Sequence, residues 1–501
     1  MGNITPIYKK GNHEFIENYR PVSTLPIFGK IFEKIIHKRL YNFFISKNIL
    51  PQTQFGFRKG HSTSHALNYS VNVIKNAHKQ KKHVLGIFID LSKAFDTLDH
   101  KILCAKLEIS GVRGTPLSLL TSYLSDRYQY TSVNGIESEK KLVKYGVPQG
   151  SVLGPLLFLL YISDMLNCYK GIDYKFVLYA DDTNLFVIDE SREQAIKKAN
   201  IILKGVNDYM QSNLLHINRN KCCFIHFEPH TRKKNPENSG DSEQVQHRLC
   251  INNHFIKEVD ETKFLGVTID KKLSWIPHIN NLHKKLKSAS GIIQKISQYI
   301  PKSQYKSIYH TLFESHLTYC ISVWGGAAKT HLDKLFRTQK HCMRLLFGDS
   351  ELYYNKLKTA DIDGSELYSV GDQKLDVNFY CKEHTKPIFK LHDILTVHNI
   401  YKYYTTLEMV KILKNRTPLL MYEQFKLSKR NNETLVILGA YSNQFMYNGP
   451  QIWNSIIKVI APKLSLGNII INIFKSKLKK YLLQIQSSLD TETWLPQNFL
   501  L

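Results

Sequence analysis

Two adjacent acidic residues, Asp181 and Asp182, stand between two short apolar runs and are the clearest candidates for chemistry in this chain. The runs cover residues 175–179 and 185–188, which predicts two strands joined by a tight turn with both carboxylates at its tip. A buried carboxylate without a partner is very costly, so the pair is either solvated or holds a cation. A polar turn explains an Asp-Asp pair as well.

A third carboxylate upstream favours the cation. Residues 84–89 form an apolar, β-branched run that ends at Asp90, so Asp90 also stands at the end of a predicted strand. Three carboxylates at the ends of central strands are typical of a site for two divalent, oxygen-preferring metal ions. The sequence therefore predicts that Asp90, Asp181 and Asp182 share such a site.

Cations stand in turns that suit a phosphate-bearing ligand. Lys9 and Lys10 lie at the tip of a predicted hairpin that also contains Arg20, and such a hairpin suits a triphosphate or a nucleic-acid backbone. Lys221 lies between two extended segments and can neutralise a leaving pyrophosphate. A solvated surface cation is the alternative for each of them.

One aromatic residue and one glycine-rich loop complete the candidate site. Phe95 lies five residues past Asp90, where a bulky ring can exclude a ribose 2′-hydroxyl by steric contact. A core aromatic is the alternative for Phe95. In residues 146–155, glycine and proline force a tight loop, in which Gln149 beside Gly150 can lie flat against an incoming nucleotide.

The composition agrees with a nucleic-acid partner. The chain has 501 residues, of which 43% are hydrophobic, so it can build several globular cores. Lys and Arg number 68 against 42 acidic residues, a net charge of +26 that favours a polyanion. The eight cysteines contain no Cys-x-x-Cys pair, and we expect them to be reduced in an intracellular compartment, the nucleus or the cytoplasm. The longest apolar run, residues 152–162, is too short to cross a membrane.

The elements that would position these residues form an α/β (α+β) pattern. A helix over residues 27–44 is predicted with Ile27, Ile31 and Ile35 on its buried face. Further helices are predicted at 64–79, 116–125, 156–164 and 191–213, strands at 4–8, 128–133, 141–145 and 223–227, a strand or a hairpin edge at 263–269, and a polar insertion at 229–249. Residues 277–347 are helical in pattern. From 276 to 350 there are eleven Lys or Arg and three acidic residues, which suits a clamp on a duplex.

In this order the blocks resemble a reverse transcriptase, and more narrowly the polymerase of non-LTR retrotransposons of the jockey-like kind. The blocks cover much of residues 4–275 and are residues 8–11, 18–21, 54–58, 88–96, 146–150, 179–182, 218–221 and 264–266. Any one of them is moderately specific, whereas seven or more in the right order are hard to explain by chance.

The resemblance implies a right-hand polymerase fold and RNA-templated DNA synthesis, with an RNA template, a DNA primer and dNTPs as partners and no membrane. Asp90, Asp181 and Asp182 would bind two Mg²⁺ ions. Arg20, with Lys9 and Lys10, would bind the triphosphate and Lys221 the pyrophosphate. Phe95 would be the sugar gate, and Gln149 with Gly150 would shape the nucleotide pocket. The primer would be gripped by Phe264, Leu265 and Gly266.

The resemblance also implies a division of the chain. The expected parts are partial fingers (1–82), the first carboxylate strand of the palm (83–115), a palm–fingers connection (116–145), the rest of the palm (146–275), a helical thumb (276–350) and a C-terminal region without assigned chemistry (351–501).

Departures from the family pattern leave alternatives open. Such elements usually carry an endonuclease domain before the polymerase, and no Cys-His knuckle follows the thumb, so we expect a copy truncated at its N-terminus. A catalytically inactive nucleic-acid-binding remnant is one alternative, and an RNA-dependent RNA polymerase is another. A structural or protein-interaction protein would make the three carboxylates accidental.

Overall fold

The computed structural model describes residues 2–169, 174–229, 248–348, 385–425, 435, 445–460 and 470–488. It divides into two compact units, residues 1–262 and 263–501. The predicted polar insertion at 229–249 lies almost wholly outside the described residues.

A five-stranded sheet forms the centre of the first unit. Its strand order is β12-β9-β3-β8-β7, with the central β3 antiparallel to both neighbours. The bounds are β3 (His83–Ile89), β7 (Tyr174–Tyr179), β8 (Asp182–Asp189), β9 (Cys223–Phe227) and β12 (Lys257–Glu258). Residues 84–89 of β3 are all buried, because helices cover both faces of the sheet.

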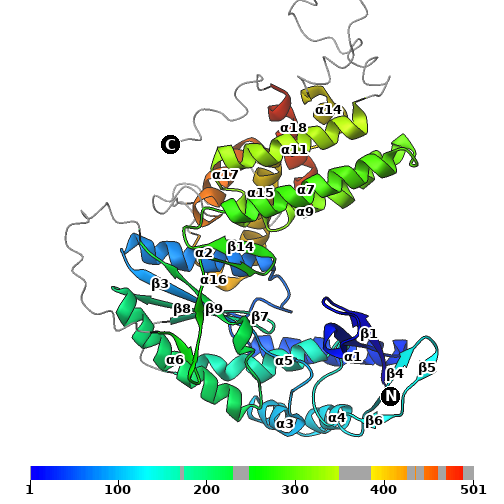
Figure 1. Ribbon diagram of the computed structural model, residues 1–501, viewed down its shortest axis with the longest axis vertical. Coiled ribbons are helices and arrows are strands. Elements are labelled where there is room, and N and C mark those ends of the chain that lie inside the picture. Colours follow the sequence, from blue (N-terminus) through cyan, green and yellow to red (C-terminus); the bar gives the residue numbers. More distant parts are fainter. Residues whose placement is uncertain are drawn as a thin grey trace, which may run out of the picture. The chain divides into compact units, whose positions relative to one another are not determined.

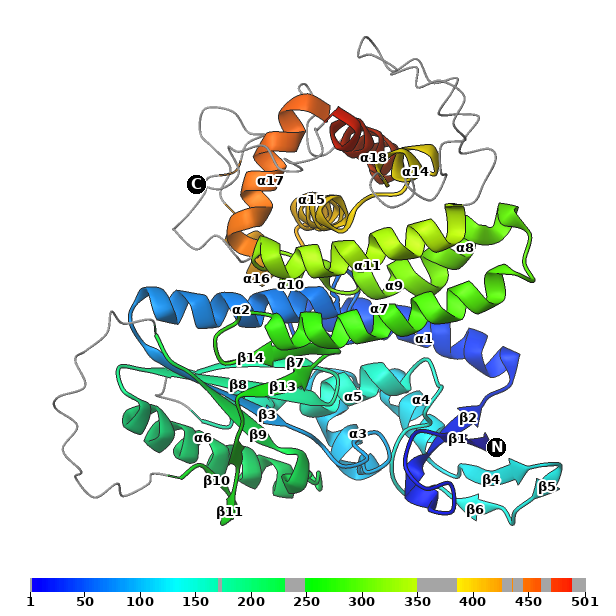
Figure 2. The same cartoon turned by 45° about the horizontal axis from the view of Figure 1, so that its top comes forward.

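Helices cover the two faces unequally (Figures 1 and 2). On one side lies α2, whereas α5 and α6 lie on the other, where Leu85, Ile87 and Ile89 join their apolar side chains in one core. The helices of this unit are α1 (Ile27–Ser46), α2 (Thr63–Lys79), α3 (His100–Ile109), α4 (Thr115–Leu124), α5 (Gly154–Ile162) and α6 (Arg192–Ser212). Each begins and ends within two residues of its predicted range, where one was predicted.

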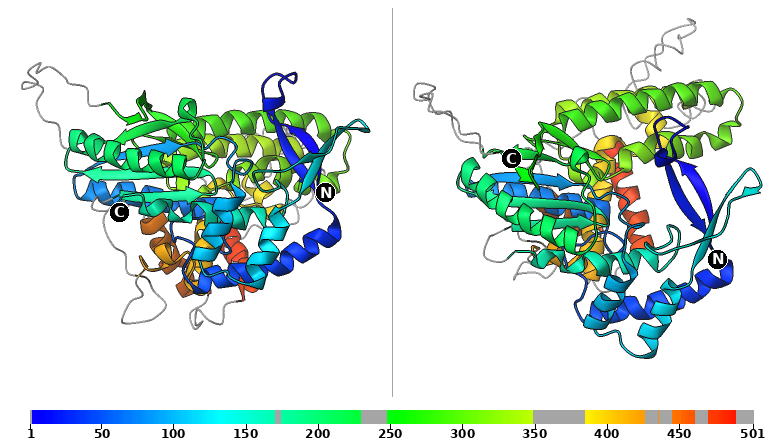
Figure 3. Two further views of the ribbon diagram at one scale, coloured as in Figure 1. Left: turned by 90° about the horizontal axis from the view of Figure 1, so that it is seen from below. Right: turned by 60° about the horizontal axis from the view of Figure 1, so that its bottom comes forward.

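A second sheet carries the N-terminal hairpin (Figure 3). In it β1 pairs antiparallel with β2 and parallel with β4. The bounds are β1 (Gly2–Tyr8), β2 (Tyr19–Thr24), β4 (Tyr128–Val133), β5 (Ile136–Glu137) and β6 (Lys141–Leu142), and a small separate pair is β10 (Cys250–Ile251) with β11 (His254–Phe255). The strand predicted at 141–145 is thus only two residues long.

The predicted orientation of α1 is wrong over its first half. Ile27, Ile31 and Ile35 were expected inside, but they are 75%, 50% and 51% exposed. The acidic Glu33 is buried instead, because its carboxyl group accepts hydrogen bonds from three donors in other elements. Polar partners therefore override the apolar spacing in this helix.

The second unit is mostly helical. It holds the hairpin of β13 (Glu261–Phe264) and β14 (Val267–Asp270), with β13 beginning at the boundary. Its longer helices are α7 (Ile276–Ser297), α11 (Lys329–Phe347), α15 (Val397–Asn415), α17 (Phe445–Ile460) and α18 (Ile471–Ser488), and its short ones are α8 (Tyr305–Ile308), α9 (Ser315–Thr318), α10 (Ile321–Trp324), α14 (Lys386–Leu391) and α16 (Leu419–Tyr422). α7 and α11 lie side by side (Figures 1 and 2).

A buried glutamine connects the segment before α15 to the earlier helix α11. Gln339 of α11 donates to Tyr309 Oη and to the Leu395 carbonyl, and it accepts from the Val397 N–H. Because the side-chain nitrogen and oxygen of Gln339 both have hydrogen-bond partners, residues 395–397 are fixed against α11. The described residues after 385 therefore belong to the same compact unit as α7 and α11.

The predicted mixed α/β fold class is confirmed. The finer division into fingers, palm, thumb and C-terminal region stays a prediction. None of the helices in the described residues is both long and apolar enough to span a bilayer. None of the seven cysteines in the described ranges forms a disulfide bond.

Candidate active site

The Asp-Asp pair occupies the tight turn between β7 and β8. Tyr179 pairs with Asp182, which leaves Ala180 and Asp181 as the two turn residues. Ala180 has a φ of 57°, the left-handed value that such hairpin turns use at their first central position. Asp181 is half-buried, and Asp182 begins β8 on the exposed side. The predicted hairpin is present, but only Asp181 lies in its turn, because Asp182 is already the first residue of β8.

A neighbouring segment locks the turn in place. The side-chain oxygen of Gln54 accepts hydrogen bonds from the Ala180 N–H (3.1 Å) and the Gly56 N–H (2.8 Å). A Cβ atom on Gly56 would come within 2.3 Å of the Ala180 nitrogen, so only glycine allows this approach. The sequence marked the block at 54–58, but it did not indicate that Gln54 supports the turn.

Asp90 follows the last residue of β3 and lies beside this turn. Ile89 pairs with Thr183, so Asp90 and Asp182 are the next residues on neighbouring antiparallel strands. The Asp90 carbonyl accepts the Asn218 N–H at 2.8 Å, and the Lys221 ammonium lies 2.9 Å from the Asp90 carboxylate. The structure thus brings Lys221 to the acidic edge of the sheet, as the prediction required.

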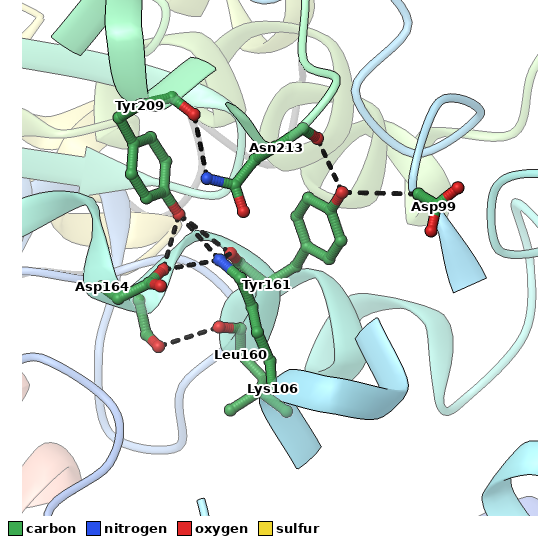
Figure 4. Close-up of polar contacts among 8 residues, drawn as sticks. Asp99, Lys106, Leu160, Tyr161, Asp164, Tyr209 and Asn213 are labelled. Carbon is green, nitrogen blue, oxygen red and sulfur yellow. Dashed lines mark hydrogen bonds and ion pairs between the residues drawn. The ribbon is translucent and has the colours of Figure 1, made fainter. Parts of the chain in front are cut away.

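A partly buried polar network holds the end of α6, from which the chain runs to Lys221 (Figure 4). The Lys106 ammonium donates to the Tyr161 carbonyl (2.6 Å), to Asp164 (2.7 Å) and to Tyr209 Oη (3.1 Å). Tyr161 Oη donates to the carbonyl of Asn213, the residue after α6. Burial lowers the pKa of Lys106, although the Asp164 carboxylate opposes that shift. No pattern in the sequence predicts this network.

The carboxyl groups influence one another electrostatically. Burial raises the pKa of Asp181, and the charge of Asp90 adds to it, whereas Lys9 and Arg20 oppose it. Partial burial and the charges of Asp181 and Asp90 raise the pKa of Asp182 to about 6. The cations on the hairpin of β1 and β2 are therefore close enough to act on the acidic edge.

The cations of this hairpin also act on one another. Burial lowers the pKa of Lys9, and so do Arg20, Lys221 and Lys10, whereas the Asp90 carboxylate raises it. Tyr8 pairs with Tyr19, and the Lys9 N–H donates to the Asn18 carbonyl, which holds the tip closed. Lys9, Arg20 and Lys221 thus form a cationic side to the acidic edge, with Lys10 exposed next to it.

The three carboxylates fit divalent metal ions by donor type but do not yet converge. Within the described ranges, no three or more His, Cys, Asp or Glu side chains gather closely enough to hold an ion. Asp90 is instead paired with Lys221, whose ammonium contacts one of its two carboxylate oxygens. A metal ion bound at Oδ2 of Asp90 would displace the Lys221 ammonium, whereas this ion pair does not involve the other oxygen. The metal-ligand roles of the three residues stay predictions.

The glycine-rich loop lies against the segment that carries Phe95. Gln149 donates from its side-chain nitrogen to both oxygens of Asp96, at 2.9 and 3.0 Å. The Gln149 carbonyl accepts the Ser23 N–H at 2.7 Å, and Gly150 has a φ of 111°. The Phe95 ring is half-buried, and its centroid lies 4.6 Å from the centroid of the Phe158 ring. The pairing of Gln149 with Asp96 was not predicted.

The predicted primer-binding residues lie in the other unit. Phe264 is buried at the end of β13, and Leu265 and Gly266, both with positive φ, form the two-residue turn to β14. Tyr319 Oη donates to the Leu265 carbonyl at 2.8 Å. The structure thus gathers Asp90, Asp181, Asp182, Lys9, Arg20 and Lys221 at one edge, and residues 264–266 form a separate hairpin.

Comparison with known families agrees with this geometry. Residues 7–269 match the family described as reverse transcriptase (RNA-dependent DNA polymerase), and this match covers more than half of the chain. The chain therefore belongs to the reverse transcriptase family.

Its relatives are polymerases of mobile elements. It is 31% identical to the RNA-directed DNA polymerase from mobile element jockey of Drosophila melanogaster, over 72% of this chain and 38% of that protein. It is 29% identical to the probable RNA-directed DNA polymerase from transposon BS of the same organism, over 69% of this chain and 38% of that protein. The chain thus spans well under half the length of these relatives. The predicted resemblance to jockey-like elements is confirmed.

Among solved structures, the apo telomerase from Candida tropicalis is similar at a TM-score of 0.37. The identity is 12%, over 84% of this chain and 68% of the telomerase.

Proposed function

We propose that this chain is an RNA-directed DNA polymerase module of a non-LTR retrotransposon, which adds dNTPs to a primer 3′-hydroxyl on an RNA template. The observation that carries the proposal is the acidic edge formed by Asp90, Asp181 and Asp182, with Lys221 and the cationic hairpin facing it. Phosphoryl transfer needs acidic residues that bind metal ions and, next to them, cationic residues that bind phosphate.

The proposed role of each charged residue follows from the sign of its charge. Asp90, Asp181 and Asp182 would hold two Mg²⁺ ions, which when bound would activate the primer hydroxyl and neutralise the triphosphate. Lys9, Lys10 and Arg20 would bind the triphosphate, and Lys221 would release Asp90 and meet the leaving pyrophosphate. Gln149 and Gly150 would contact the base or sugar, Phe95 would exclude ribose, and residues 264–266 would hold the primer. We propose an intracellular site of action, in the nucleus or the cytoplasm.

Primer extension tests the proposal directly. The purified chain is given poly(rA)/oligo(dT), dTTP and Mg²⁺, next to an Asp181→Asn variant. We expect extension by the wild-type chain and a loss of at least about a hundredfold in the variant. Binding of the template–primer should stay unchanged.

The other outcomes identify the alternatives. Template–primer binding without extension by the wild-type chain would contradict the proposal and indicate a non-catalytic remnant. Preferential incorporation of UTP over dTTP would indicate an RNA polymerase.

A further inference from the structure

Glu33 is an acidic residue of α1 that the structure turns into the protein. It is 5% exposed, whereas its neighbours Phe32 and Lys34 are exposed. Burial of a carboxyl group is costly unless donors satisfy its oxygens. The hydrogen-bond donors to the Glu33 carboxylate therefore indicate the role of this residue.

The donors come from the loop that precedes α5 and from α4. One Glu33 oxygen accepts the Val152 N–H at 2.5 Å and the Leu153 N–H at 3.4 Å, and the other accepts the Tyr123 hydroxyl at 2.8 Å. Because α5 begins at Gly154, these N–H groups belong to its N-terminal end, where a negative charge is favourable. Burial and the Glu33 carboxylate together raise the pKa of Tyr123, so this hydroxyl remains a donor.

The same loop is held at its other end by the candidate nucleotide pocket. Gln149 is bonded through its side chain to Asp96 and through its carbonyl to the Ser23 N–H. Between the two ends, the Ser151 hydroxyl donates to the Pro148 carbonyl and accepts the Gly154 N–H. Glu33 is therefore the anchor on the α5 side of Gln149 and Gly150.

We infer that Glu33 is a positioning residue for nucleotide binding, holding the backbone of Val152 and Leu153 so that Gln149 and Gly150 meet the incoming dNTP. It contacts no substrate itself. The inference rests on the proposed function, because the dNTP is the ligand of that function. It adds a residue from α1, far from the acidic edge in sequence, to the machinery of the pocket.

Hydrogen exchange tests the anchor without any catalysis. In Glu33→Ala, the amides of Val152 and Leu153 should exchange about tenfold faster or more, since their acceptor is gone. Peptides from α2 and β3 should keep wild-type protection. The matched control is Glu108→Ala, which removes a carboxyl group from an exposed position of α3 and should leave residues 146–153 unchanged.

Kinetics test the consequence for the nucleotide. For Glu33→Ala we expect KM for dTTP to rise about 10- to 100-fold, the usual effect of losing a hydrogen bond to a charged group. The Kd for poly(rA)/oligo(dT) should stay within about twofold of wild type, since the loop is assigned to the nucleotide and not to the duplex. Glu33→Gln keeps one acceptor oxygen for the Val152 N–H and should recover most of the loss. Tyr123→Phe keeps both backbone bonds and should have a smaller effect than Glu33→Ala.

Each result decides the question. An unchanged KM for dTTP in Glu33→Ala would overturn the inference. So would equal effects of Glu33→Ala, Glu33→Gln and Tyr123→Phe on kcat, on KM and on the affinity for the duplex. If Glu33→Ala does not fold, Glu33→Gln and Tyr123→Phe carry the test through the same KM and exchange readouts. If the wild-type chain extends no primer, the proposed function fails, and the exchange experiment still reports whether Glu33 anchors the loop.

Discussion

Phe95 lies at the edge of the core, next to Asp96, which is bonded to Gln149 of the glycine-rich loop. Its ring lies against the fully buried Phe158 and meets Phe57 edge to face at 6.2 Å between ring centroids. The ring therefore cannot retreat into the core, because proteins are close-packed there. This is the physical property that a residue excluding a 2′-hydroxyl needs.

Replacing this ring should weaken sugar discrimination. In Phe95→Val we expect the ratio of kcat/KM for dTTP over UTP to fall by about tenfold or more, because space opens beside the sugar. Single-nucleotide extension with each substrate measures the ratio. Phe44→Val, which removes a buried ring of α1, should lower stability but leave the ratio unchanged. An unchanged ratio in Phe95→Val would show that this ring packs against the core and does not select the sugar.

Lys221 offers a test that separates stability from catalysis. Its ion pair with Asp90 is half-exposed, so Lys221→Ala should change the free energy of unfolding by less than about 1 kcal/mol. The rate of primer extension should fall much more, by about tenfold or more, if the ammonium meets the leaving group. Arg192→Ala breaks the equally exposed ion pair with Glu258 and serves as control. Equal extension rates in both variants would count against the proposed role.

At the level of elements, the turn between β13 and β14 depends on one glycine. Gly266 has a φ of 83°, and a Cβ atom there would lie 2.9 Å from the Tyr319 ring, whose hydroxyl holds the turn through the Leu265 carbonyl. The turn and the ring thus define each other's position. In the sequence this glycine marks only a turn.

Gly266→Ala should destabilise the second unit by about 1–3 kcal/mol, because both the φ value and the ring contact oppose a methyl group. Gly291→Ala, in α7, has nothing within 4 Å of its added methyl group and should be neutral or stabilising by up to about 1 kcal/mol. Urea denaturation of both variants measures the difference. Similar stability of the two would show that the turn adapts.

The start of α7 should make the second unit sensitive to acid. Burial, with the charge of Lys285 adding to it, lowers the pKa of His278 from 6.5 to about 4. The unfolded chain therefore binds the proton first, so stability should decrease as the pH falls from about 6.5 to 4, by up to about 3 kcal/mol.

His278→Asn can still accept the Thr268 N–H but does not titrate, and it should flatten this part of the curve. Thermal unfolding between pH 4 and 7 measures the slope. An identical slope in both proteins would exclude His278 as the source.

At the scale of the whole molecule, charge distribution is the main functional feature. The net charge is +26, and only Lys9, Lys10, Arg20 and Lys221 of the 68 Lys and Arg residues belong to the candidate site, so most cations lie elsewhere and are available for phosphates. The helices α7 and α11 of the second unit are rich in lysine and arginine. The proposed nucleic-acid partner would neutralise this excess, which otherwise disfavours the compact state.

Binding of poly(rA)/oligo(dT) should therefore depend steeply on salt. With roughly six to ten phosphate contacts, the affinity should fall about 10³- to 10⁵-fold between 50 and 200 mM salt. Fluorescence anisotropy measures it, and Asp181→Asn should give the same slope because the turn does not hold the duplex. A salt-independent affinity would contradict a phosphate-based interface.

Local patterns predicted much of the fold. The apolar run before Asp90, the Asp-Asp turn and most helices are correct, because strand and turn signals lie within a few residues of one another. The sequence alone also determined the family, through short blocks in a fixed order that the family match confirms.

Only the tertiary structure decided how these pieces are held. Glu33 turns inward against the spacing of its own helix to reach Val152, which is 119 residues away. Gln54 supports Ala180 from 126 residues away. A side chain's own sequence neighbourhood cannot reveal such partners, because a buried polar group is placed by the donors and acceptors that folding brings to it.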